Sequence, residues 1–301
     1  MLVDTNYYFE NIFKTLTMKR IGIMLLLALS MLGAKADDFG LWTGVGFGQN
    51  LGVKGLDADV DLGFRSNNSV RNVDRWSAGF GLSYAICRYL KVGASYTYMY
   101  GYSGAERKEN YKSDNVTWEG YNLTHAYWRS KNRFSFDLKT GVDVGRFTFS
   151  LRERYQLTGY NSVGVIKEKY RYKKPIPVYD ENGNFVENFY PNQEGYPQTV
   201  NDRKEHKTKE YLRSKVEASY NIRHCPLEPS VSVEFENNLH DGFKLDEVRY
   251  VAGLDWKISK KVRLGACYHF NCGHDADAND NLHAIEVSLK FKNLFGGVKK
   301  K

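Results

Sequence analysis

A two-residue alternation of polar and apolar side chains runs through most of this chain. In segment 133–144 (RFSFDLKTGVDV), polar residues occupy the odd positions and apolar residues occupy most of the even ones, and segment 146–152 (RFTFSLR) repeats the pattern. Successive side chains of a β-strand point to opposite faces, so each such strand has one apolar face and one charged face. Repetition of this pattern from strand to strand is typical of a transmembrane β-barrel, whose apolar face contacts lipid.

An export signal precedes the alternating segments. A basic start at 18–20 (MKR) leads into an apolar run over 21–32, and 34–36 (AKA) matches the small-residue pattern at which signal peptides are cleaved. The apolar run is too short to cross a bilayer as a helix. The sequence therefore predicts a secretory signal peptide that is cleaved after Ala36.

This signal divides the chain into two parts. Residues 1–36 are interpreted as an N-terminal extension and cleaved signal, with the signal itself over 18–36, and residues 37–301 as one outer-membrane β-barrel. Translation can begin at Met1 or at Met18. The predicted location is the outer membrane of a Gram-negative cell.

The alternation predicts strands of an all-β fold, a transmembrane antiparallel β-barrel of ten to twelve strands with long extracellular loops. Very short connections alternate with long ones at 103–128, 159–208 and 272–282, and Asn182-Gly183 predicts a hairpin within the second of these. The first strand-like segment disturbs the even count of bacterial barrels, so it is either a wall strand with an unrecognised partner or a segment packed in the lumen. The predicted segments are 39–48, 55–66, 73–86, 89–102, 129–144, 146–158, 209–223, 230–239, 246–259, 261–271 and 283–295.

The chain is basic, with a formal net charge of +8, but its basic residues are interleaved with acidic ones. Nucleic-acid binding usually requires a basic stripe or patch, so nucleic acid is not an expected partner. The expected partners are outer-membrane lipid and lipopolysaccharide, the barrel-assembly machinery during biogenesis, and a small solute or glycan. We expect a monomer.

Inward positions of the predicted strands carry charges of both signs, including Asp59, Asp61, Lys91, Lys139, Lys215, Lys290 and Lys292. The structural interpretation is a salt-bridged interior that holds a small barrel rigid, and the functional one is a hydrated, porin-like channel whose fixed charges select the solute. Arginine suits carboxylate and phosphate groups. The candidate lumen and selectivity residues are Arg75, Arg133, Asp137, Arg152, Arg154, Arg213, Glu234, Glu236, Arg249 and Arg263.

Three functions follow from this interpretation. The first is a narrow passive channel for small charged or sugar-like solutes. The second is a non-conducting barrel whose external loops, 103–128 and 159–208, bind a ligand or surface partner. The third is a lipid-modifying enzyme with His283 near the outer rim. No convincing Ser–His constellation accompanies that histidine, so we expect a protein that is not an enzyme.

Cysteine and histidine patterns predict neither a metal site nor a cofactor site. Cys267 and His269 share the inward face, but a second pair of ligands with zinc-site spacing is missing. The four cysteines, Cys87, Cys225, Cys267 and Cys272, permit three complete disulfide pairings, among which the sequence does not choose.

Several segments resemble the DUF2490 family. They are Phe39-Gly40-Leu41-Trp42, Leu62-Gly63-Phe64-Arg65, the Leu82–Tyr84 and Val92–Tyr98 pair, Leu227-Glu228-Pro229 before the strand 231–236, and the final strand 285–291. The resemblance implies an exported protein of the outer-membrane barrel group, common in Bacteroidetes and of unknown function. It implies no active site. The loop at 159–208 is longer than the family usually has between its sixth and seventh strands.

Overall fold

The computed structural model describes residues 38–67, 69–111, 113, 118–171, 176–189, 198–273 and 281–294. The predicted signal peptide and its cleavage site lie outside these residues. Within the described part of the chain, no helix has the length and hydropathy needed to cross a bilayer.

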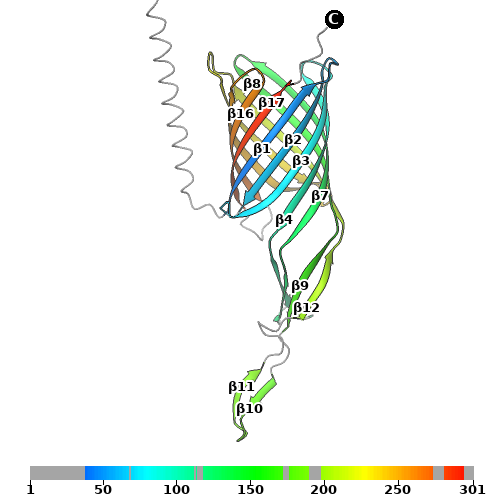
Figure 1. Ribbon diagram of the computed structural model, residues 1–301, viewed down its shortest axis with the longest axis vertical. Coiled ribbons are helices and arrows are strands. Elements are labelled where there is room, and N and C mark those ends of the chain that lie inside the picture. The colour runs from blue at the N-terminus through cyan, green and yellow to red at the C-terminus, as the bar shows by residue number, and fades with distance from the viewer. Residues whose placement is uncertain are drawn as a thin grey trace, which may run out of the picture. The chain divides into compact units, whose positions relative to one another are not determined.

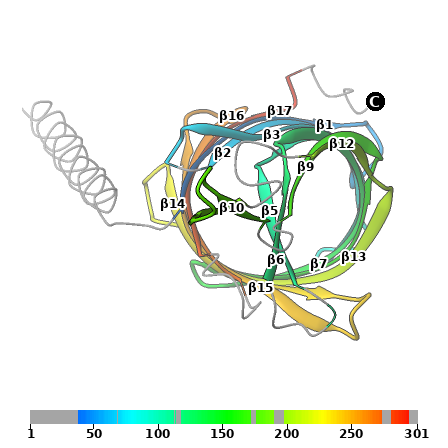
Figure 2. The ribbon, with the colours of Figure 1, turned by 90° about the horizontal axis from the view of Figure 1, so that it is seen from below.

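Eleven strands close into a barrel in the order β1-β17-β16-β15-β14-β13-β8-β7-β4-β3-β2, which Figures 1 and 2 show from the side and along the axis. The predicted fold class is confirmed, and each predicted strand is present with bounds shifted by at most three residues. The observed strands are β1 (Asp38–Asn50), β2 (Leu56–Asn67), β3 (Asn72–Ala85), β4 (Leu90–Ser103), β7 (Tyr127–Val144), β8 (Phe147–Tyr160), β13 (Lys207–Tyr220), β14 (Leu227–Asn238), β15 (Lys244–Lys257), β16 (Val262–Gly273) and β17 (Leu282–Lys292).

The odd strand count makes one pair parallel. Strand directions alternate around the barrel, so the first and last of eleven strands run the same way. Accordingly, β1 pairs with β17 in parallel, from Asp38↔Leu282 to Gly48↔Lys292, and with β2 in antiparallel. Segment 39–48 is therefore a wall strand with two partners. The alternative that it packs inside the lumen is wrong, and the expected all-antiparallel barrel is corrected at this one pair.

The two ends of the barrel differ in their connections. At the short-turn end, the strands are joined by 51–55, 86–89, 145–146, 221–226 and 258–261. The tightest of these is the two-residue turn Gly145-Arg146, in which Gly145 has a φ of +64° that glycine adopts without strain. The long connections leave from the opposite end, which we call the extension end.

The long connections at the extension end contain regular strands. From 103–128 come β5 (Glu106–Tyr111) and β6 (Trp118–Thr124), and from 159–208 come β9 (Val163–Arg171) and β12 (Gln198–Lys204); they form one sheet in the order β12-β9-β6-β5, called the extension sheet. The predicted loop 103–128 therefore contains two strands. Arg129 holds the base of this sheet, since its Nε and Nη2 atoms donate to the carbonyls of Asn161 and Glu205, each at 2.6 Å.

The hairpin predicted around Asn182-Gly183 is confirmed. It comprises β10 (Ile176–Tyr179) and β11 (Phe185–Phe189). Asp180 closes the turn because its Oδ1 atom accepts hydrogen bonds from the amides of Asn182 and Asn184, at 2.9 and 2.7 Å. These bonds, led by that from Asn184, hold the pKa of the Asp180 carboxyl below its usual value.

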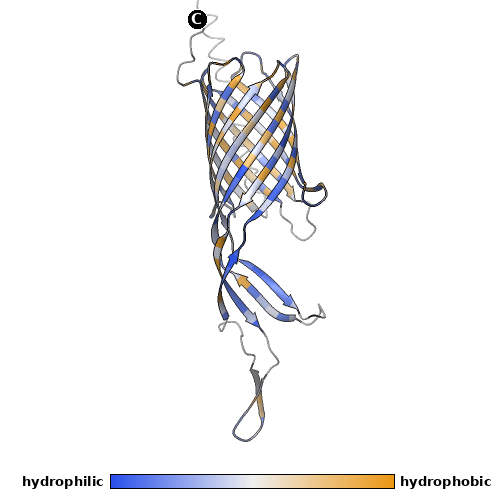
Figure 3. Cartoon of the chain, turned by 90° about the vertical axis from the view of Figure 1, so that its right-hand side faces the viewer, coloured by the Kyte–Doolittle hydropathy of each residue, from blue (hydrophilic) through white to orange (hydrophobic). Residues whose placement is uncertain are grey.

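The barrel is apolar outside and polar inside. The most buried side chains include Gln156, Thr158, Arg213 and Glu234, whereas many large apolar side chains are exposed. Figure 3 shows hydrophobic and hydrophilic residues alternating along the strands of the wall. A water-soluble protein would reverse this distribution, so the chain has a β-barrel of the outer-membrane type. Outward apolar side chains include Leu62, Trp76, Phe80, Tyr98, Phe134, Phe136, Leu138, Phe149, Val216, Val231, Tyr250, Trp256 and Val287.

Candidate functional site

The lumen has two unlike walls. Strands β1 to β4 mostly contribute small inward residues toward the short-turn end, whereas β7, β8 and β13 to β15 contribute long charged ones. The side chains of Asp61 and Asp59 extend over the glycines of the wall that carries the small residues. A Cβ atom at Gly46 would lie 2.6 Å from Asp61 Oδ1, and one at Gly81 would lie 2.5 Å from Asp59 Oδ2, so both positions require glycine for these carboxylates to lie as they do.

The half of the lumen nearer the extension end is tightly filled. We call it the packed half and define it by inward side chains that are at most 9% exposed: Trp42, Met99, Gln156, Arg213, Glu234 and His269. Trp42 lies between the ring of His269, at a centroid distance of 4.6 Å, and the guanidinium of Arg65, at 3.8 Å. Such stacking fixes the indole across the lumen.

Glu234 is the centre of an ion-pair network in the packed half. Its carboxylate accepts hydrogen bonds from Arg152 and Arg213, and Arg249 Nη1 approaches to 3.4 Å. Arg213 also pairs with Glu236 at 3.2 Å, and Arg249 with Glu247 at 2.6 Å. Buried charges are tolerated only when paired in this way, so the network fixes these side chains in place.

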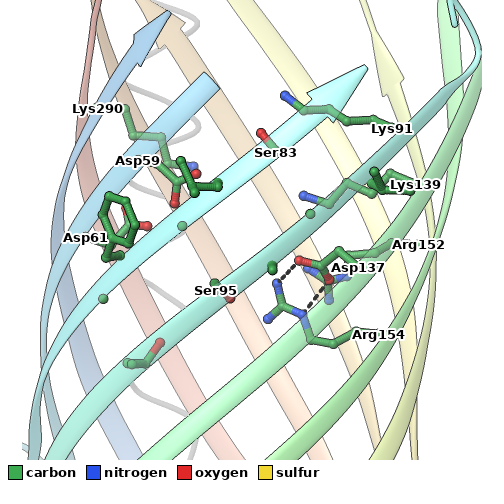
Figure 4. A pocket seen from close by; sticks show the side chains of 18 of the residues that line it. Asp59, Asp61, Ser83, Lys91, Ser95, Asp137, Lys139, Arg152, Arg154 and Lys290 are labelled. Atoms are coloured by element: carbon green, nitrogen blue, oxygen red, sulfur yellow. Dashed lines mark hydrogen bonds and ion pairs between the residues drawn. The ribbon is translucent and has the colours of Figure 1, made fainter. Parts of the chain in front are cut away.

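The half nearer the short-turn end contains a polar cavity of about 600 Å³. We call it the open half. Figure 4 shows Asp59, Asp61 and Lys290 on one side of this cavity and Lys91, Lys139, Arg152, Arg154 and Asp137 on the other, with Ser83 and Ser95 between them. Glycines at 79, 81 and 93 line the same wall and leave the space free.

Six cations line the cavity, against three carboxylates. The cations are Lys91, Lys139, Arg152, Arg154, Lys290 and Lys292, and the carboxylates are Asp59, Asp61 and Asp137. Asp137 is fully engaged, because Arg154 binds both of its oxygens at 2.7 and 2.9 Å. The lining of the open half therefore carries more cationic than anionic groups, although Lys91 and Arg152 are paired with carboxylates outside the lining.

The predicted selectivity residues are distributed over both halves. Arg152, Arg154 and Asp137 line the cavity; Arg213, Glu234, Glu236 and Arg249 form the network of the packed half. Arg75 pairs with Asp74 at 3.5 Å, and Arg133 donates to the hydroxyl of Thr158 at 3.3 Å. Arg263 lies directly opposite Lys290 in the barrel wall.

Choosing arginines as selectivity candidates overlooked the lysines of the cavity. Lys91, Lys139, Lys290 and Lys292 are all predicted to point inward and line the cavity, but they are not among the predicted selectivity residues. Most of the chosen arginines are held by carboxylates, whereas Lys139, Lys290 and Lys292 make no ion pair with any residue that the structure describes. For Lys139, the sequence signal is its position opposite Arg152 across the short turn at 145–146.

The remaining sequence candidates lie apart from the cavity. His283 Nδ1 is 2.6 Å from the hydroxyl of Tyr268, so its neighbours are Tyr268 and the ring of Phe270. His269 Nε2 lies 3.0 Å from Glu286. No cluster of three metal-ligating side chains occurs among the described residues, and the four cysteines are free. The expectation that His283 does not serve a lipid-modifying enzyme stays a prediction.

Comparison with solved structures finds similar barrels at low sequence identity. The NanC porin is 10% identical with a TM-score of 0.37, over 84% of this chain and 98% of that chain. The outer membrane protease OmpT from Escherichia coli is 11% identical with a TM-score of 0.38, over 74% of this chain and 80% of that chain. No curated protein matches the sequence.

A comparison with family models agrees with the sequence resemblance. The model for a family described as protein of unknown function, DUF2490, matches residues 39–282 and so spans the barrel from β1 to the start of β17. The chain belongs to the DUF2490 family.

Proposed function

We propose that this protein is a narrow passive channel of the outer membrane for small charged or sugar-like solutes. The observation that carries the proposal is the polar cavity of about 600 Å³ within the lumen. Barrels of about eight strands are filled by side chains, and those of sixteen or more leave an open channel. Eleven strands with a partly open, charged interior fit a pore of small bore between these limits.

The packed half sets the bore of this channel. Trp42 and Met99 are only 3% and 2% exposed, so they leave little room for water beside them. Conduction requires the side chains of this constriction to leave a passage, through which solutes would move one molecule at a time. We therefore expect small unitary currents, well below those of wide porins.

Orientation follows from the two ends of the barrel. Outer-membrane barrels have short periplasmic turns and longer external connections. We infer that the short-turn end faces the periplasm and that the extension sheet stands outside the cell. We further propose that the channel works as a monomer surrounded by lipid and lipopolysaccharide.

Single-channel recording of the refolded protein across a salt gradient tests the channel. Folding is first established by near-ultraviolet circular dichroism and by resistance to trypsin, so that a silent sample is known to contain intact barrels. Steady small openings with a non-zero reversal potential are expected. A folded barrel that passes no current at any applied voltage would overturn the proposal.

A second function, binding of a surface ligand or partner, is favoured by the order within the extension sheet. Tyr121 of β6 stacks on Tyr170 of β9 at 4.4 Å, and the guanidinium of Arg107 lies 3.8 Å above the Tyr121 ring. Such packing gives the sheet a fixed surface outside the barrel. If surface binding is the function, deleting 170–200 should abolish it while leaving any current intact or larger. If the protein is only a channel, the full chain should bind no surface partner in the first place.

A further inference from the structure

Four cations lie directly opposite one another across four neighbouring strands of the lumen. Lys91 of β4 faces Lys139 of β7, Lys139 faces Arg152 of β8, and Arg152 faces Lys215 of β13. We call these residues the cation row. Like charges directly opposite in a sheet destabilise it, so an uncompensated row opposes folding.

Three members of the row have carboxylate partners on its flanks. Lys91 Nζ lies 2.9 Å from Asp57, Arg152 pairs with Glu234, and Lys215 Nζ lies 2.5 Å from Glu217. Lys139, inside the row, makes no ion pair within the described part of the chain. Its neighbour along β7, Asp137, is taken by Arg154. Lys139 thus has no ion pair of its own and shares the attraction of Asp137 with Arg154, between two further cations of the row.

The side chain of Lys139 faces the cavity. Figure 4 shows the side chains of Lys91 and Lys139 extending into the same space, with Arg152 beside them. The hydroxyls of Ser83 and Ser95 border this space and can donate hydrogen bonds. An oxyanion there would meet ammonium, guanidinium and hydroxyl donors, which is a typical donor set for carboxylate or phosphate.

The opposite side of the cavity restricts how an anion can lie. Asp59 and Asp61 are in the lining there, together with Lys290 and Lys292. Carboxylates repel an anionic group but accept hydrogen bonds from hydroxyls or amines. A ligand would therefore direct its oxyanion to the cation row and its neutral polar part to Asp59 and Asp61.

We propose that the cation row is a binding site for the carboxylate or phosphate group of a small anionic solute. This inference rests on the proposed channel, because it names the class of solute that passes through the lumen. A bound anion would offset the repulsion among the cations of the row. It would also give Lys139 the ion pair that this residue lacks.

Equilibrium binding to the purified, detergent-solubilised full chain tests the site without requiring conduction. Inorganic phosphate and acetate are titrated separately in calorimetry, and the unfolding temperature is measured with and without each. We expect binding and a raised unfolding temperature with at least one probe. Lys139→Gln should weaken binding at least about tenfold, the size expected for one charge-assisted hydrogen bond. The probe that binds more tightly identifies phosphate or carboxylate as the preferred group.

The matched control is Lys257→Gln. Lys257 also lies toward the short-turn end but outside the cavity lining, and it pairs with Glu228 at 2.6 Å. The Lys257→Gln variant should bind phosphate and acetate with the same affinities as the wild type. Lys139→Gln should also unfold at a higher temperature than the wild type without anion, because it removes a like charge from the row. A merely misfolded variant would not show that gain.

Failure of the site and failure of the channel give different results. Anion binding without current would retain the site and overturn the channel. Steady current in chloride that is unaffected by phosphate or acetate, with no heat of binding for either, would retain the channel and overturn the site. Equal binding by the wild type and Lys139→Gln would also overturn it.

Discussion

The packed and open halves of the lumen are enclosed by the same strands, yet one is filled and the other is hollow. The difference lies in side-chain size along β1 to β4. Toward the extension end these strands contribute Trp42, Arg65 and Met99, and toward the short-turn end they contribute mainly Gly, Ser and Thr. Strand number fixes the diameter of a barrel, but a few inward residues decide how much of it remains open.

The ion pairs of the packed half should carry the largest energetic effect. Glu234→Gln leaves Arg152, Arg213 and Arg249 without their shared carboxylate, and breaking a buried pair costs about 3–5 kcal/mol. We expect a loss of this order in the free energy of unfolding, measured by urea titration in lipid vesicles. Glu228→Gln, near the short-turn end, is the control and should cost much less. Equal losses would mean that the two halves do not differ in this respect.

Opening the packed half should raise conductance severalfold. Trp42→Ala removes the indole that lies between His269 and Arg65 across the lumen. The measurement is unitary current in potassium chloride. Trp76→Ala is the matched control, since Trp76 is 55% exposed on the outer wall and its loss should leave the current unchanged. An unchanged current in Trp42→Ala would place the constriction elsewhere.

Filling the open half should have the opposite, smaller effect. A leucine at Gly81 would place its Cβ 2.5 Å from Asp59 Oδ2 and extend into the cavity, so Gly81→Leu should lower the unitary current. Gly164→Leu in the extension sheet is the control, because no heavy atom lies within 4 Å of a Cβ there. A current that stays the same in Gly81→Leu would show that solutes bypass the cavity.

The smallest expected effect is a change in charge selectivity. Asp61→Asn removes one carboxylate from the cavity lining and should shift the reversal potential modestly toward anion preference. Asp180→Asn, in the turn of the β10–β11 hairpin, should cause no shift. A shift toward cations in Asp61→Asn would contradict the assignment of positive excess to the open half.

The sequence predicts the wall of this barrel well because lipid imposes the alternation. Lys139 and Asp137 were placed inward from period-two patterning alone, and the two-residue turn at 145–146 suffices to set Lys139 opposite Arg152. The two remaining contacts of the cation row, Lys91 with Lys139 and Arg152 with Lys215, do not follow from the sequence, because the long connections 103–128 and 159–208 separate their strands. Lys91 and Lys139 lie on strands joined by the connection 103–128, whose length leaves their register undetermined.

The extension sheet could not be predicted because it lies outside the region where lipid imposes an alternation of polar and apolar residues. Strand β5 (ERKENY) lies beyond the apolar wall, so neither of its faces needs to be apolar and no alternation marks it. Its order comes instead from pairing with β6 and from side-chain contacts such as the hydrogen bond of Trp118 Nε1 to Glu109, at 2.6 Å. In these connections, only the Asn182-Gly183 pair predicted regular structure, in the form of a hairpin.

Because β1 and β17 are parallel, the start of the first wall strand and the end of the last one lie at opposite rims of the barrel. Asp38 begins β1 at the rim that carries the extension, while Lys292 ends β17 at the opposite rim. A peptide epitope joined directly before β1 would therefore be displayed on the far side of the membrane from one joined after β17.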